Sequence, residues 1–228
     1  MILVPDRYKE VFDKSKGYAG LMGLSVGKLA FSHPTLLRAY AAFMQDHFSE
    51  SVFLIADHPK IHNIRALEGA SWEEAERRVN IAGNDMQRSL EKVVSSFPSV
   101  RIARWTDFHD IVYTHNFQVI LQEFDGEFKR RVDTITMAFL ELPANKAKWK
   151  SRASPPLEIA RRYVLEELAL LTAIPFAFKL PLCEIYPGRN EIQEDLQSKK
   201  FRGLNGRLLV KPDFVFMEAY YEPLHTSS

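Results

Sequence analysis

The sequence has little cysteine, little net charge and no long apolar run, and each absence excludes a class of protein. The one cysteine, Cys183, cannot form an intramolecular disulfide, which excludes a disulfide-stabilised scaffold and fits a cytoplasmic protein. A small buried apolar residue is the favoured interpretation of this thiol. The apolar start, Met1 to Pro5, is too short for a signal peptide, and no apolar run approaches membrane-spanning length.

Net charge, chain length and histidine spacing further limit the partners, the number of domains and the metal sites that the sequence can indicate. A formal net charge of +1 does not indicate a nucleic-acid partner, so any RNA-binding surface must gather its basic residues on one face. The 228 residues, 46% of them hydrophobic, predict a single domain over residues 1–228. The seven histidines do not combine with other ligands at a recognisable spacing, and His58 and His62 follow a strand end beside Pro59 in a predicted loop. We therefore predict no metal site and no cofactor.

Short apolar runs alternate with longer helical patterns along the chain, which predicts an α/β fold with a parallel sheet and crossover helices. The predicted strands cover residues 18–24, 51–56, 100–104, a run ending at Tyr186, 206–210 and 214–219. The predicted helices cover 34–48, 71–94, 107–142 with a junction near Gly126, 155–172 and 190–199, and 145–154 reads as a basic, polar loop. Ligands of such sheets bind beyond the carboxyl ends of the strands, where Ser25 and Tyr186 both fall.

The run Gly23-Leu24-Ser25-Val26-Gly27 places a serine on a glycine-flanked turn after a strand. One interpretation is the G-x-S-x-G elbow of a serine hydrolase, in which Asp213 and His225 would have to serve as the acid and the histidine of the catalytic triad. That elbow normally follows several strands, whereas only about twenty residues precede this one. A second interpretation is a tight turn that needs two glycines.

Two further segments carry polar groups suited to a binding site. Tyr163 and Glu167 are four residues apart on a predicted helix and share a face, where a phenol and a carboxylate suit an ammonium group. The alternative is an amphipathic helix with Glu167 in water. Tyr186 precedes Pro187 and Gly188 at a predicted strand end, and it can also be a plain anchoring residue at a turn.

Together these segments resemble the tRNA-dependent cyclodipeptide synthases over roughly residues 18 to 215. The resemblance rests on Gly23-x-Ser25 with Phe31-Ser32 after it, Tyr163-x-x-x-Glu167 and Tyr186-Pro187. The position three after the serine, an asparagine in one subfamily, is Lys28, and Tyr-Pro replaces that subfamily's Tyr-His. The chain therefore looks like the other subfamily, named for its X, Tyr and Pro.

The resemblance implies a Rossmann-like parallel sheet flanked by helices, similar to the catalytic domains of class I aminoacyl-tRNA synthetases. It also implies two aminoacyl-tRNAs as partners and a ping-pong reaction through an aminoacyl-Ser25 enzyme that ends in a diketopiperazine. By the same resemblance, the protein would be a monomer and would not need ATP. The synthetase signatures His-Ile-Gly-His and Lys-Met-Ser-Lys-Ser are both absent. Glu167 with Tyr163 would hold the α-amino group, and the Tyr186 hydroxyl would assist.

The resemblance also suggests residues that bind substrate and tRNA. The first side-chain pocket would be lined by Leu21, Gly23, Phe53, Ile55, Trp105, Leu170, Leu171 and Glu184, and the second substrate would be flanked by Gly188, Arg189 and Asn190. The helix over 71–94 would bind tRNA through Arg77, Arg78, Arg88 and Lys92, with Lys129-Arg130-Arg131 and the basic run from Lys146 to Arg152 as further candidates. Each basic group can also be ordinary solvated surface. A non-catalytic tRNA-binding module and a serine hydrolase remain the competing functions.

Overall fold

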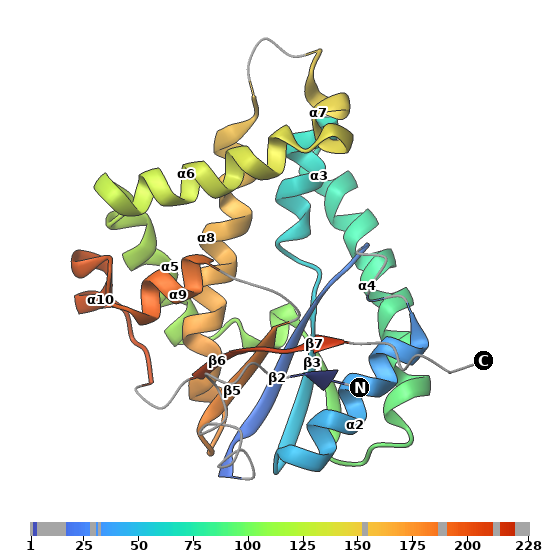
Figure 1. Cartoon of the computed structure of the whole chain (residues 1–228). Helices are drawn as coiled ribbons and strands as arrows, with labels where there is room; N and C mark the ends of the chain where they lie inside the picture. The colour runs from blue at the N-terminus through green and yellow to red at the C-terminus, as the bar shows by residue number, and fades with distance from the viewer. Residues whose placement is uncertain are drawn as a thin grey trace.

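A five-stranded parallel sheet lies between two layers of helices in the computed structural model (Figure 1), which describes residues 2–3, 17–27, 31, 33–151, 155–186, 191–211 and 215–221. The strand order is β4-β3-β2-β5-β6. The strands are β2 (Ala19–Ser25), β3 (Glu50–Ala56), β4 (Val100–Arg104), β5 (Leu182–Tyr186) and β6 (Val215–Glu218). A separate antiparallel pair joins β1 (Ile2–Leu3) to β7 (Tyr220–Tyr221). The predicted α/β class with a parallel sheet is confirmed.

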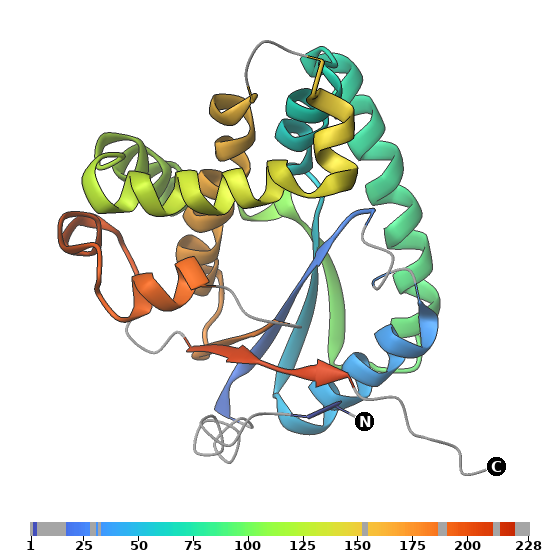
Figure 2. The same cartoon turned by 45° about the horizontal axis from the view of Figure 1, so that its top comes forward.

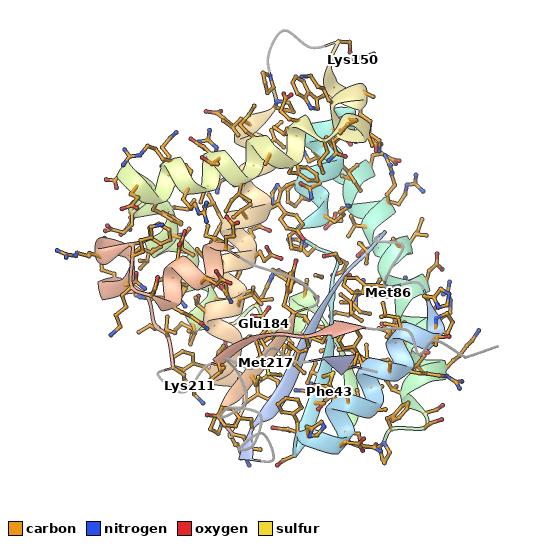
Figure 3. The ribbon with its side chains drawn as sticks, in the orientation of Figure 1. Phe43, Met86, Lys150, Glu184, Lys211 and Met217 are labelled. Atoms are coloured by element: carbon orange, nitrogen blue, oxygen red, sulfur yellow. The ribbon has the colours of Figure 1, made fainter. Side chains whose placement is uncertain are left out.

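One face of the sheet packs on α2 (Pro34–His47) and α4 (Trp72–Val94). Met22 and Leu24 of β2 point to this face, together with Phe53 and Ile55 of β3 and Ile185 of β5. Figure 3 labels Phe43 and Met86, which α2 and α4 contribute to the same layer. The helix α4 begins as predicted, because the Ser71 hydroxyl accepts a hydrogen bond from the Glu74 N–H at 3.2 Å.

The other face packs on α8 (Leu157–Ala173), with the 3-10 turn η4 (Trp105–Phe108) and α5 (Ile111–Gln122) beside it. Leu21 of β2 and Leu54 of β3 meet Trp105, Leu170 and Leu171 there. Side chains alternate between faces along a strand, so the one-residue offset from Leu21 to Met22 separates the two cores.

Three helices lie above the carboxyl ends of the strands. α3 (Lys60–Glu68) follows β3 and packs along α8, and α6 (Gly126–Glu141) also packs on α8. Figures 1 and 2 show α6 crossing above the sheet, with α7 (Pro143–Trp149) at its end next to α3. α9 (Glu191–Gln197) and α10 (Arg202–Arg207) connect β5 to β6.

Three local predictions were wrong. The predicted loop around His58 and His62 contains helix α3, and the predicted basic loop at 145–154 overlaps α7. Trp149 is buried and donates its N–H to the Leu140 carbonyl at 2.9 Å, which gives the basic segment an apolar anchor. The predicted strand at 206–210 is absent because α10 ends there and the Asn116 side chain takes both backbone groups of Leu209.

Candidate active site

A cavity of about 760 Å³ opens where the carboxyl ends of β2 and β5 meet α3, α6, α8 and α9. The four predicted catalytic residues, Ser25, Tyr163, Glu167 and Tyr186, all line it. They come from three elements and from positions up to 161 residues apart, so only the parallel sheet with α8 beside it brings them together. The volume lies within the range of small-molecule sites.

Ser25 is the last residue of β2 and is half-buried. Its Oγ lies 3.5 Å from the Tyr163 hydroxyl. Gly27, two residues on, has a φ of 77°, a left-handed conformation that glycine adopts without a Cβ clash. Lys199 is the sole non-glycine residue of the described ranges with positive φ, so Ser25 lacks the strained left-handed backbone expected of a hydrolase elbow.

Tyr163 and Glu167 lie one turn apart on α8 and face the cavity together. Burial, and then the negative charge of Glu167, raises the pKa of the Tyr163 hydroxyl above its usual value. Tyr163 therefore stays neutral and can donate a hydrogen bond. A carboxylate beside a neutral phenol, both partly shielded from water, can hold a substrate ammonium group.

Tyr186 ends β5, and Glu184 lies two residues earlier on the same side of that strand. Burial, followed by the charges of Glu167 and Glu184, raises the pKa of Tyr186. Glu184 is 1% exposed and accepts a hydrogen bond from Gln193 Nε2 at 3.0 Å. Burial, and then repulsion from Glu167, raises its pKa to about 8. Figure 3 shows Glu184 in the interior, so this carboxyl group does not reach solvent.

The eight predicted pocket residues do not share one face of the sheet. Leu21, Trp105, Leu170 and Leu171 pack in the core on the α8 side, and Glu184 pairs in register with Leu21. Phe53 and Ile55 instead pair with Met22 and Leu24 and join the core under α2 and α4. The structure thus places these two side chains away from the Ser25 face, because β3 turns Val52, Leu54 and Ala56 toward it.

Several cavity residues were missed from the sequence. α3 contributes Lys60 and Asn63, and α6 contributes an apolar wall that includes Ile135 and Phe139. No local motif indicates that either helix lines a cavity, since the sequence predicts a loop where α3 lies and an ordinary amphipathic helix where α6 lies. A period-3.6 apolar stripe does not reveal whether it faces a core or a cavity.

The four predicted tRNA-binding residues lie on α4, and three of them have carboxylate partners. Arg77 binds Glu74, Arg78 binds Glu68 at 2.7 Å, and Arg88 binds Asp85. Lys92 is exposed one turn beyond Arg88 and makes no ion pair within the described part of the chain. Most of this charge is therefore locally balanced.

The further basic candidates are also largely paired. Lys129 and Arg131 bind carboxylates of α6 and α9, and Lys146 and Lys148 bind Glu141 and Glu68.

Some predicted residues lie outside the described ranges, namely Lys28, Ser32, Arg152, Pro187, Gly188, Arg189, Asn190, Asp213 and His225. Within those ranges, no three His, Cys, Asp or Glu side chains are arranged to hold a metal ion. None of the helices described there is long and apolar enough to cross a membrane. Cys183 is fully buried, and burial raises the pKa of its thiol, as expected for a packing residue.

Comparison with known families identifies one match along most of the chain. The family model described as Cyclodipeptide synthase matches residues 9–203. No curated protein sequence matches at a significant level.

Solved structures with the same fold cover nearly the whole chain. A CDPS from Fluoribacter dumoffii has a TM-score of 0.80 at 16% identity, covering 97% of each chain. A Mycobacterium tuberculosis protein, reported as relating cyclodipeptide synthetases to type I tRNA synthetases, has a TM-score of 0.67 at 15% identity and covers 96% of this chain and 90% of its own. A cyclodipeptide synthase from Candidatus Glomeribacter gigasporarum, bound to Phe-tRNAPhe, has a TM-score of 0.69 at 17% identity, covering 92% and 89%.

Proposed function

Because the chain belongs to the cyclodipeptide synthase family, we propose that it joins the aminoacyl groups of two aminoacyl-tRNAs through an ester on Ser25. The observation that carries this proposal is the single cavity lined by Ser25, Tyr163, Glu167 and Tyr186. A relative in complex with Phe-tRNAPhe supports the substrate class. The assignments of these four residues are part of the proposal.

In the first step, Ser25 Oγ attacks the ester carbonyl of an aminoacyl-tRNA. An Oγ–carbonyl bond forms, the bond to the tRNA ribose oxygen breaks, and the serine proton ends on that oxygen. Glu167 and the neutral Tyr163 hold the α-ammonium group and orient the ester. Because the substrate ester is already activated, orientation and stabilisation of the oxyanion are the enzyme's main tasks.

In the second step, the neutral amine of aminoacyl-Ser25 attacks the ester carbonyl of a second aminoacyl-tRNA. An amide bond forms, the bond to the tRNA ribose oxygen breaks, the amine proton ends on that oxygen, and a dipeptidyl enzyme results. The free amine of that dipeptide then attacks the Ser25 ester, which closes the diketopiperazine ring and regenerates the hydroxyl. Tyr186 lines the same cavity, with a pKa raised by burial, so its hydroxyl is a neutral donor for the oxyanions. These steps form a ping-pong mechanism that uses no ATP, metal or cofactor.

Several features of the wider molecule belong to the same proposal. The Tyr-Pro pair at Tyr186 and the lysine at position 28 favour the X-Tyr-Pro subfamily. Lys92, with Arg77, Arg78 and Arg88, would contact tRNA phosphates along α4. We propose a monomer with one domain over residues 1–228, acting in the cytoplasm where charged tRNAs are available.

Mass spectrometry tests the function directly. Bacteria that express the chain should release diketopiperazines into the medium, and the Ser25→Ala variant should lower their yield about 10³-fold or more. Intact-protein mass spectra of the purified enzyme with aminoacyl-tRNA should show one added aminoacyl group, absent from the Ser25→Ala variant. The Cys183→Ala variant is the matched control, since the buried thiol has no part in the reaction.

The alternatives predict other results. A serine hydrolase would turn over simple esters and depend on His225. A non-catalytic module would bind tRNA equally well without the Ser25 hydroxyl and form no acyl-enzyme. A well-folded protein that yields neither a diketopiperazine nor an acyl-enzyme would overturn the proposal.

A further inference from the structure

Two polar side chains of α3 face the proposed reaction cavity and have no role in the chemistry described so far. Lys60 and Asn63 lie three residues apart, so they share one face of the helix. Both line the same cavity as Ser25 and Glu167. Neither side chain makes a hydrogen bond or ion pair within the described part of the chain.

The polar ends of these two side chains are accessible from the cavity. Asn63 is 7% exposed and Lys60 is half-buried, and neither contributes to the fully buried polar atoms that lack a partner in the described part of the chain. Two donors one turn apart that open into a cavity can bind a ligand with acceptor atoms.

Local electrostatics favour an anion next to Lys60. Glu68, the one nearby carboxylate that acts on this lysine, is bound by Arg78 at 2.7 Å and by Lys148 at 3.1 Å. Burial, and then repulsion from Lys148, lowers the pKa of Lys60. An anion that replaced the lost hydration would relieve both effects.

Positive and negative side chains of the cavity lie on different helices. Lys60 is the one cationic side chain among the described residues that line it, whereas Glu167 and Glu191 are anionic. Glu191 is bound by Arg131 at 2.6 Å. Glu167 thus suits a substrate ammonium group, and α3 suits a negative group of the same substrate.

We propose that Lys60 and Asn63 bind the phosphodiester that links the last two nucleotides of the aminoacyl-tRNA. This inference rests on the proposed function, because the aminoacyl-tRNA supplies an ammonium group and a phosphate on either side of one ester. Lys60 contributes the charge, and the Asn63 amide donates to a phosphate oxygen or accepts from the ribose hydroxyl. The α6 wall, including Phe139, offers an apolar surface for the terminal base. Lys60 is accordingly a positioning residue.

A pair of short substrates isolates this phosphate. Aminoacyl-adenosine and aminoacyl-cytidylyl-adenosine carry the same ester and differ by one phosphodiester and one nucleoside. In the wild type, kcat/KM for acylation of Ser25 should be about tenfold higher for the dinucleotide, the loss expected for one charged hydrogen bond. In Lys60→Ala this preference should fall to less than twofold, and Lys60→Arg should restore most of it.

Full-length tRNA provides a readout that does not depend on acylation. With aminoacyl-tRNA, Lys60→Ala should raise KM about tenfold and change kcat less than twofold. With deacylated tRNA, it should raise Kd by a similar factor and reduce the slope of log Kd against log salt by about 0.7, the value for one single-stranded phosphate. Lys179→Ala is the matched control, because this exposed lysine precedes β5 at the opposite end of the sheet.

The outcomes separate three cases. If Lys60 instead accepts the Ser25 proton, Lys60→Ala will lower kcat equally for both short substrates and leave the salt slope unchanged, which overturns the inference. An unchanged KM and Kd in a folded Lys60→Ala variant also overturns it. If wild-type Ser25 is never acylated while Lys60→Ala still weakens tRNA binding, the proposed function fails and the phosphate contact stands.

Discussion

The two faces of the sheet are equally buried but differ in the chemistry they enclose. Under α2 and α4 the core is apolar, and its buried hydroxyls are satisfied by backbone: Tyr40 donates to the Ala219 carbonyl at 2.9 Å and Ser51 to the Met44 carbonyl at 3.4 Å. On the α8 side, the structure buries Glu166, Glu184 and His62. The α4 side also buries a carboxylate, Asp57, but Arg104 supplies the opposite charge. Burying an ionisable group without an opposite charge costs free energy, so Glu184, whose hydrogen-bond partner is the neutral Gln193, indicates where function has overridden stability.

The largest expected effect tests the apolar face. Ile55→Ala removes a fully buried side chain under α2 and α4 and should lower the free energy of unfolding by about 2–5 kcal/mol, measured by urea denaturation. The ratio of diketopiperazine products should not change, because Ile55 faces away from Ser25. Leu21→Ala, equally buried on the α8 side, should destabilise similarly and also shift the product ratio. A product shift with Ile55→Ala would show that the two faces are not functionally separate.

A smaller effect should distinguish two neighbouring glutamates of α8. Glu167→Gln should lower kcat/KM about 10–100-fold with little change in melting temperature, since it removes a charged hydrogen bond to substrate. Glu166 instead bonds His62 Nε2 at 2.9 Å and joins α8 to α3. Glu166→Gln should therefore cost mainly stability, about 1–3 kcal/mol, measured by thermal unfolding. Equal losses of activity in the two variants would contradict this division.

The smallest effect concerns Glu184, whose pKa rises from 4.5 to about 8 on folding. The folded state keeps a proton that the unfolded state has lost, so the stabilising contribution is complete below about pH 4.5 and disappears as pH rises through 8. Relative to Glu184→Gln, which stays neutral, the wild type should lose roughly 1–3 kcal/mol of stability between pH 5 and pH 8. Unfolding free energies measured across this range check the sign. A difference between the two proteins that does not vary with pH would show that Glu184 keeps its ordinary pKa.

Local sequence patterns predicted the elements whose signals are local. The apolar runs identified β2, β3 and β4 within one residue at each end, and they identified the last residue of β5. Ser71 marked the start of α4, and the spacing of Tyr163 and Glu167 placed both on one face of α8. The glycine-flanked serine was correctly expected at a strand end.

The segments that were misread depend on distant partners. α7 is anchored by Trp149 through the Leu140 carbonyl, and the backbone of Leu209 is bound by Asn116, 93 residues away. Neither partner is visible in the local pattern. The sequence also could not show which side chains of β3 face the site. The run 51–56 is continuously apolar, so it has no alternation of polar and apolar residues that would distinguish the two faces of the strand.

The sequence by itself determined the alternation of strands and helices, the family resemblance and the four residues proposed for catalysis. These features depend on short-range periodicity and on short sequence motifs, which can be recognised without a structure. Only the tertiary structure decided that α3 and α6 complete the cavity and that Phe53 and Ile55 face away from it. It also decided that Lys60 and Asn63 reach the cavity without a partner among the described residues. The reason is geometric: a cavity at the ends of parallel strands is formed by whichever helices cross above them, and that crossing is set by packing between residues far apart in the chain.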